Sequence, residues 1–78
     1  MSISQSEILY NIYKIMRLKE LRLKNNLTQK EIADYLNIKQ NTYSQYENGK
    51  RQVPTEIYMR LADYYDVSLD YLLGRKDF

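Results

Sequence analysis

Four amide and hydroxyl side chains have the spacing of one face of an α-helix. They are Gln40, Asn41, Ser44 and Gln45. At about 100° per residue they fall within an arc of about 140° that holds no charged residue, while Tyr43 and Tyr46 fall on the opposite side. Side-chain amides are costly to bury, because each one taken from water needs hydrogen-bond partners. We therefore expect this face to point outward and to exchange hydrogen bonds with a partner molecule.

The major groove of duplex DNA has hydrogen-bonding edges that suit these side chains. Gln or Asn can donate to and accept from adenine N6 and N7 together, whereas Arg suits guanine O6 and N7. The face carries three amides and no Arg, so A·T pairs are the expected contacts, although a Gln can also donate to guanine. Base contacts are therefore predicted for the four residues. An ordinary solvated surface remains the alternative interpretation of this helix taken alone.

Two short amphipathic helices joined by a turn at residues 37–39 are predicted to position this face, as a helix-turn-helix motif over residues 29–48. The first helix opens with the capping-box pattern of Thr28 and Glu31, in which each side chain satisfies a backbone amide of the other residue. Its inward-facing stripe comprises Ile32, Ala33 and Leu36. Asn37 suits the turn, because Asn takes a positive φ at low cost.

The reading helix is predicted to run from about Gln40 to Asn48 and to end at Gly49. Three further helices are predicted at about Ser6–Lys24, Thr55–Tyr65 and Leu69–Leu73. Their boundary signals are Ser6 as N-cap, Asn25 and Asn26 as exit, Pro54 at a first turn, Ser68 as N-cap and Gly74 as end. No strand pattern competes, so the sequence predicts one small all-α domain of five helices.

Composition argues against catalysis. Seventy-eight residues form a single modest core with no room for an enzyme cleft of ordinary size. The absence of Cys and His removes disulfides, thiolate or imidazole metal sites, and Ser-His or Cys-His nucleophile pairs. The remaining candidates for a carboxylate-based hydrolase are scattered, with no clustered pair: Glu31, Asp34, Glu47, Asp63, Asp66 and Asp70. We therefore expect no enzyme, no metal site and no cofactor.

Neither the N-terminus nor the apolar runs of the chain indicate export or a membrane. The N-terminus MSISQSEILYN has no basic region before its apolar residues, as a signal peptide would. No apolar run approaches the roughly 18 residues of a membrane span. The expected location is the cytoplasm, with no membrane partner.

Charge is distributed unevenly along the chain. Residues 1–52 hold nine basic and five acidic groups, a net charge of +4, and residues 53–78 hold three basic and five acidic groups, a net charge of −2. One positive lobe favours a polyanionic partner, although chance clustering on a solvated surface would look the same. Phosphate contacts are predicted around the reading helix, at Gln29, Lys39, Asn48, Lys50 and Arg51.

The segment LTQKEIADYLNIKQNTYSQYENGK, followed by LADYYDVSLDYLLG, resembles the Cro and phage-repressor type of helix-turn-helix domain, the XRE family. The resemblance runs from about Arg17 to Gly74 and implies a compact five-helix, lambda-repressor-like DNA-binding domain. It implies base contacts at Gln40, Asn41 and Gln45, and phosphate contacts at Gln29, Asn48 and Lys50. It also implies a partly buried ion pair between Arg22 and Glu47, which would account for an acid beside the reading face.

Three positions depart from the family's pattern. Asn37 replaces the usual turn Gly, Lys39 stands where a capping Ser or Thr is common, and Tyr43 occupies a position usually held by Ile or Val. The ring of Tyr43 must either fit between the helices or tip its hydroxyl outward. No departure removes a named contact. The implied function is sequence-specific binding of an operator in double-stranded DNA, as a transcriptional regulator of the repressor type.

Residues 1–16 form a predicted helical extension that the resemblance does not explain, ahead of the domain at residues 17–74 and a tail at residues 75–78. Leu18 and Leu21 mark the inward face of the first helix. A second apolar stripe lies far around the same helix and comprises Ile8, Leu9, Ile12, Ile15 and Met16.

This stripe has several possible explanations. The helix could break near Arg17, or the stripe could fold back over the last helix. It could instead meet the second copy of a homodimer, since repressors of this type bind two half-sites. An alternative function, an antitoxin-type module that also binds DNA, would use the stripe to hold a different protein. A membrane anchor is not expected, because Glu7 and few Lys residues accompany it.

Overall fold

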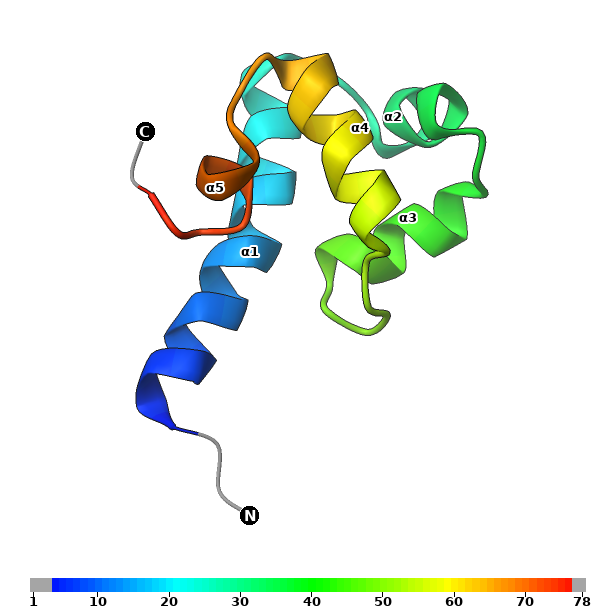
Figure 1. Cartoon of the computed structure of the whole chain (residues 1–78). Coiled ribbons are helices and arrows are strands. Elements are labelled where there is room, and N and C mark those ends of the chain that lie inside the picture. Colours follow the sequence, from blue (N-terminus) through cyan, green and yellow to red (C-terminus); the bar gives the residue numbers. More distant parts are fainter. Residues whose placement is uncertain (1–3, 77–78) are drawn as a thin grey trace.

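The computed structural model of the protein describes residues 4–76, apart from the side chains at positions 6, 10, 11, 13, 14 and 15. Within this range the chain forms five helices and no strand: α1 (Gln5–Lys24), α2 (Gln29–Leu36), α3 (Gln40–Glu47), α4 (Thr55–Tyr65) and α5 (Leu69–Leu72) (Figure 1). The prediction of an all-α fold with five helices is therefore confirmed.

Every one of these helices ends at a residue with positive φ, which turns the chain back toward the helix. These residues are Asn26, Asn37, Gly49, Asp66 and Gly74, with φ between 55° and 80°. In each case the next backbone amide donates to the carbonyl five residues earlier, as Ile38 does to Ala33 at 3.0 Å. Asn and Asp tolerate this conformation because their short polar side chains can bond locally. The predicted exits at Asn26, Asn37, Gly49 and Gly74 are confirmed, and Asp66 adds a fifth.

Asn37 ends α2 in the left-handed region, with φ 58° and ψ 43°. We expect Asn37→Ala to lower the free energy of unfolding by about 1 kcal/mol, because Ala keeps the Cβ that crowds the following carbonyl oxygen but lacks the short polar side chain that offsets this crowding in Asn. Asn37→Gly should stay close to wild type, since freedom at positive φ offsets the larger loss of backbone entropy. Urea unfolding of both variants measures the effect, and equal stability of the Ala variant and the wild type would contradict it.

The start of α1 differs from the prediction. The N-cap is Ser4, not Ser6, and its hydroxyl accepts a hydrogen bond from the Glu7 backbone amide at 3.2 Å. Ser4 stands three residues before Glu7, which is the spacing of a capping box, and the prediction overlooked this signal. The capping box at α2 is confirmed, with reciprocal bonds of 2.9 and 3.0 Å between Thr28 and Glu31.

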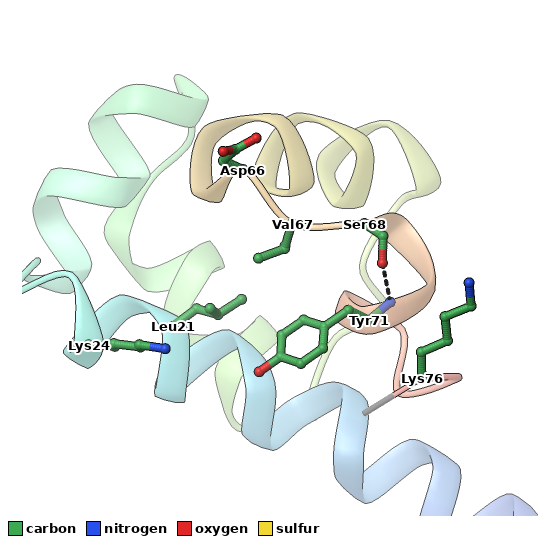
Figure 2. A pocket seen from close by; sticks show the side chains of 7 residues that line it. All are labelled: Leu21, Lys24, Asp66, Val67, Ser68, Tyr71 and Lys76. Atoms are coloured by element: carbon green, nitrogen blue, oxygen red, sulfur yellow. Dashed lines mark hydrogen bonds between the residues drawn. The ribbon is translucent and has the colours of Figure 1, made fainter. Parts of the chain in front are cut away.

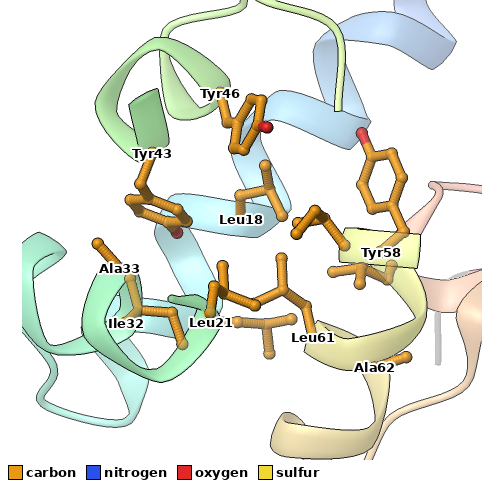
Figure 3. Close-up of a cluster of buried hydrophobic side chains, with 12 residues drawn as sticks. Leu18, Leu21, Ile32, Ala33, Tyr43, Tyr46, Tyr58, Leu61 and Ala62 are labelled. Carbon is orange, nitrogen blue, oxygen red and sulfur yellow. The ribbon is translucent and has the colours of Figure 1, made fainter. Parts of the chain in front are cut away.

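The core lies where α1 meets the other helices, and Figure 3 shows its side chains converging from all sides. The predicted α2 stripe is buried, with at most 2% of any side chain exposed, as are Leu18 of α1 and Leu61 of α4. Tyr43 is fully buried (0% exposed), so its ring fits between the helices instead of tipping outward. Burial, reinforced by the neighbouring Glu47 carboxylate, raises the pKa of Tyr43 well above its usual range.

Arg60 ties α4 to the end of α2. Its guanidinium donates to the backbone carbonyls of Leu36 at 3.0 Å and Tyr35 at 2.9 Å, and it lies 5.3 Å from the centre of the Tyr35 ring. The last carbonyls of a helix lack partners within the helix, so this cation satisfies two of them. The helix that precedes the turn is thereby anchored to the body of the domain.

α1 is one continuous helix, so the proposed break near Arg17 is wrong. Its N-terminal half extends away from the other helices (Figure 1). Four members of the apolar stripe are exposed, by 47%, 48%, 43% and 54%: Ile8, Leu9, Ile12 and Met16. The alternative in which the stripe folds back over the last helix is therefore wrong for these four side chains. The side chain of Ile15 lies outside the described residues.

Contact between α1 and the C-terminal part is made further along the helix. The Arg17 guanidinium donates to the carbonyls of Tyr71 and Lys76, and it lies 4.2 Å from the centre of the Tyr71 ring. This contact fixes the second half of α1 against α5. The four described side chains of the apolar stripe on the first half are left outside the core.

Candidate nucleic-acid interface

The predicted reading face of α3 points outward. Gln40 and Asn41 are exposed, and Ser44 and Gln45 are partly exposed, while Tyr43 and Tyr46 on the other side are buried. α3 therefore has the division between a polar outer face and an aromatic inner face that its spacing indicates. The helix is eight residues long, about two turns, so all four side chains lie near one another along one edge of the domain.

The residues predicted to contact phosphate surround this face. Lys39, Asn48, Lys50 and Arg51 are exposed, and Gln29 at the start of α2 is partly buried. Lys39 is the N-cap of α3 and makes no side-chain capping bond, because its ammonium group cannot accept a hydrogen bond. Its positive charge instead adds to the positive end of the helix dipole, a combination that attracts anions.

A buried ion pair holds α3 against α1. Arg22 Nε donates to Glu47 Oε2 at 2.6 Å, and Arg22 Nη2 donates to Glu47 Oε1 at 3.1 Å. The two residues are only 8% and 5% exposed, so the pair is more deeply buried than the resemblance implies. Arg22 Nη1 also donates to the carbonyl of Leu27 at 2.9 Å. The Arg22 guanidinium therefore joins α1, the loop before α2 and the end of α3.

The pair fixes the charge of Glu47. Burial alone would raise the pKa of its carboxyl group, but the Arg22 guanidinium, with help from Tyr43 and Gln29, more than offsets this effect and leaves the pKa of Glu47 below its ordinary value. The carboxylate correspondingly raises the pKa of Arg22. Glu47 is thus an acid whose charge is already neutralised, and it does not confront a polyanion as a free negative charge.

Gln29 belongs to the same cluster. Its Nε2 donates to Glu47 Oε1 at 3.2 Å. A side-chain amide has two N–H donors, so this bond uses one of them and leaves the second for another partner. The sequence predicts Gln29 only as a phosphate contact. Its link to α3 has no signal in the sequence, because it joins residues 18 positions apart.

Two further bonds connect predicted base contacts to predicted phosphate contacts. Arg51 Nε donates to Gln45 Oε1 at 2.8 Å, and Asn48 Nδ2 donates to Ser44 Oγ at 3.4 Å. The Ser44–Asn48 spacing of four residues could have indicated the second bond. The first bond crosses the end of the helix and has no comparable signal in the sequence.

A separate hollow of about 560 Å³ lies between α1, the α4–α5 connection and the C-terminal residues (Figure 2). Its lining consists of Leu21, Lys24, Asp66, Val67, Ser68, Tyr71 and Lys76. None of these residues belongs to the predicted DNA-contacting set. Within the described part of the chain, no group of three or more acidic, His or Cys residues is arranged to hold a metal ion. In the same part, no helix has the length and apolar character needed to cross a membrane.

Comparison with known proteins identifies the motif. The helix-turn-helix family (HTH_3) matches residues 18–72. The HTH-type transcriptional regulator ImmR of Bacillus subtilis is 48% identical over 61 residues, which are 78% of this chain and 48% of that protein. The regulator AnsR of the same organism is 45% identical over 60 residues, 77% of this chain and 52% of that protein.

A more distant relative is the cryptic phage CTXphi transcriptional repressor RstR of Vibrio cholerae, which is 32% identical over 58 residues, 74% of this chain and 52% of that protein. The chain spans about half the length of these curated relatives. The family match extends from α1 to α5 and includes both helices of the motif and the turn between them. The chain belongs to the helix-turn-helix family of the Cro and phage-repressor type, the XRE family.

Proposed function

We propose that this chain binds double-stranded DNA sequence-specifically as a transcriptional regulator of the repressor type, with α3 in the major groove. The observation that carries the proposal is the outward face of amides and hydroxyls on α3, held from behind by buried tyrosines and the Arg22–Glu47 pair. A rigid support of this kind matters, because a side chain reads a base only from a fixed position. We propose the cytoplasm as its location, in keeping with action on DNA.

The contacts divide into two classes. Gln40, Asn41, Ser44 and Gln45 contact base edges, which carry sequence information. The phosphate contacts come from Gln29, Lys39, Asn48, Lys50 and Arg51. The basic members of this second set supply affinity for any duplex through counterion release. The relatives described above are two transcriptional regulators and a transcriptional repressor, which supports the same function for this chain.

We further propose that the DNA-bound form is a homodimer joined through the exposed stripe of α1. A single two-turn helix touches too few base pairs to be selective, so a two-fold pair of half-sites is needed. The stripe comprises at least Ile8, Leu9, Ile12 and Met16, each more than two-fifths exposed. Packed against the same face of a second copy, it forms a self-complementary interface of the kind that two-fold dimers use.

The two classes of contact predict different losses. On the preferred site, Gln40→Ala should cost about 1–3 kcal/mol of binding free energy and relax one base preference, whereas on a scrambled duplex it should cost little. Lys50→Ala, the control, should weaken binding to both duplexes and lower the salt slope by about one unit. Affinities at several salt concentrations measure both effects. If Gln40→Ala weakens both duplexes equally, α3 does not read bases.

A further inference from the structure

The end of α3 brings Arg51 back against a base-reading side chain. Gly49 has φ 70°, its amide donates to the Tyr46 carbonyl at 3.2 Å, and the Lys50 amide donates to the Gln45 carbonyl at 2.9 Å. These two bonds are the Schellman arrangement, which folds the chain back over the last turn of a helix. The side chain of Arg51 therefore lies beside Gln45, and Arg51 Nε donates to Gln45 Oε1 at 2.8 Å.

Arg51 also decides which way the Gln45 amide faces. A guanidinium group has only donors, so the atom of Gln45 turned toward it must be the oxygen. A hydrogen bond from a charged donor is stronger than one between neutral groups, and it strengthens further where DNA excludes water. Gln45 is thereby held with its oxygen toward Arg51 and its NH₂ group turned away.

This orientation changes what Gln45 can read. The bidentate contact with adenine needs one donor and one acceptor, at N7 and N6. The Arg51 bond takes one of the two lone pairs of the Gln45 oxygen and turns that oxygen toward Arg51. The NH₂ group, with its two donors, is therefore the part of the amide presented to the bases. Among the base edges of the major groove, guanine places two acceptors, N7 and O6, side by side. Two donors on one NH₂ group match that edge and do not match adenine N6.

We propose that Arg51 is a specificity-determining residue that sets Gln45 to read guanine instead of adenine. The inference rests on the proposed function and deepens it. Only for Gln45 does it replace the expected A·T contact. The expectation for Gln40 and Asn41 is unchanged. Arg51 acts here as a positioning residue, and its Nη groups keep their donors for the DNA backbone.

The test starts with selection of bound sequences from random duplexes by the full chain. The base pair that Gln45 reads is the one whose preference is relaxed in Gln45→Ala. At that pair the wild type should prefer guanine over adenine by about tenfold. In Arg51→Ala the Gln45 oxygen is released, and the preference should move toward adenine. Replacing the guanine with 7-deazaguanine, which lacks the N7 acceptor, should weaken the wild type severalfold and leave Gln45→Ala unchanged.

Two controls separate this effect from lost charge. Lys50→Ala removes a neighbouring cation and should weaken binding uniformly, with the guanine preference intact. In a variant that already carries Gln45→Ala, the further change Arg51→Ala should likewise weaken binding to all sequences equally, without shifting any base preference. An unchanged guanine preference in Arg51→Ala, an adenine preference in the wild type, or no relaxed pair in Gln45→Ala would each overturn the inference while leaving selective binding in place. If no sequence is enriched from random DNA, the proposed function fails, and this inference fails with it.

Discussion

Glu47→Ala is expected to lower the free energy of unfolding by about 3–5 kcal/mol, because it leaves the Arg22 guanidinium buried without its counterion. Arg22 is only 8% exposed and is held by contacts at 2.6 and 3.1 Å from Glu47. The change also removes the acceptor of the Gln29 amide. Small domains have about 5–15 kcal/mol of stability in total, so the loss would be a large share of it.

Urea or thermal unfolding followed by circular dichroism measures this loss. The matched control is the double variant Arg22→Met with Glu47→Leu, which removes both charges and keeps most of the volume. We expect it to recover most of the stability, since replacing both partners of a buried pair is often neutral or stabilising. If Glu47→Ala lowers the free energy of unfolding by less than about 1 kcal/mol, the pair behaves as an exposed salt bridge. The proposal that it holds α3 in place would then be contradicted.

The same pair adds a pH dependence. The pKa of Glu47 lies below its ordinary value in the folded protein, so the unfolded chain binds a proton at higher pH than the folded one does. The stabilising contribution is therefore complete above the ordinary Glu pKa of about 4.3 and is lost as the pH falls through the folded pKa. Stability measured between pH 6 and acid conditions should fall more steeply in the wild type than in the double variant.

Replacing Ile8 and Ile12 together with Gln is expected to weaken binding to an operator with two half-sites by about 10²–10⁴-fold. If α1 joins the dimer, binding of the second half-site is intramolecular in the wild type and bimolecular in the variant. Both residues are exposed, by 47% and 43%, so the fold should persist. Gln is neutral and favours helix, which leaves the electrostatic contribution unchanged. Affinity for a single half-site should not change.

Met59→Gln is the matched control, since Met59 is 54% exposed on α4 and belongs to neither the stripe nor the DNA-contacting set. Analytical ultracentrifugation should find a dimer for the wild type and Met59→Gln and a monomer for the double Gln variant. A dimer in all three would contradict the role of α1. A monomeric wild type that gains a specific protein partner through the stripe would favour the antitoxin-type alternative over the homodimer.

Local signals in the sequence predicted most of the helix boundaries. The capping box of Thr28 and Glu31 and the exits at Asn37 and Gly49 involve neighbours within a few residues, so the chain carries this information wherever it folds. The start of α1 shows the limit of such signals. Two nearby serines could both cap the helix, and the backbone bond to Glu7 selects Ser4.

The spacing of α3 also determined which side of that helix is polar and which is aromatic, since this depends only on helical geometry. The spacing could not decide whether the large Tyr43 ring would fit inside. That depends on the space left between α1, α2 and α3, and such space exists only after the helices have packed. The continuity of α1, and with it the exposure of the four described residues of its apolar stripe, likewise depended on what the helix packs against.

Contacts between residues that are distant in sequence, or that lie on either side of a helix end, became visible only in the tertiary structure. The Arg22–Glu47 pair was implied by resemblance, but its depth and its link to Gln29 come from three elements meeting at one point. The bond from Arg51 to Gln45 depends on the reversal of the chain at Gly49. Sequence periodicity describes one element at a time, whereas these contacts depend on how one segment lies against another. The sequence therefore determined which residues lie on the polar outer face of α3, and the packing decided which of their hydrogen-bonding groups are already engaged.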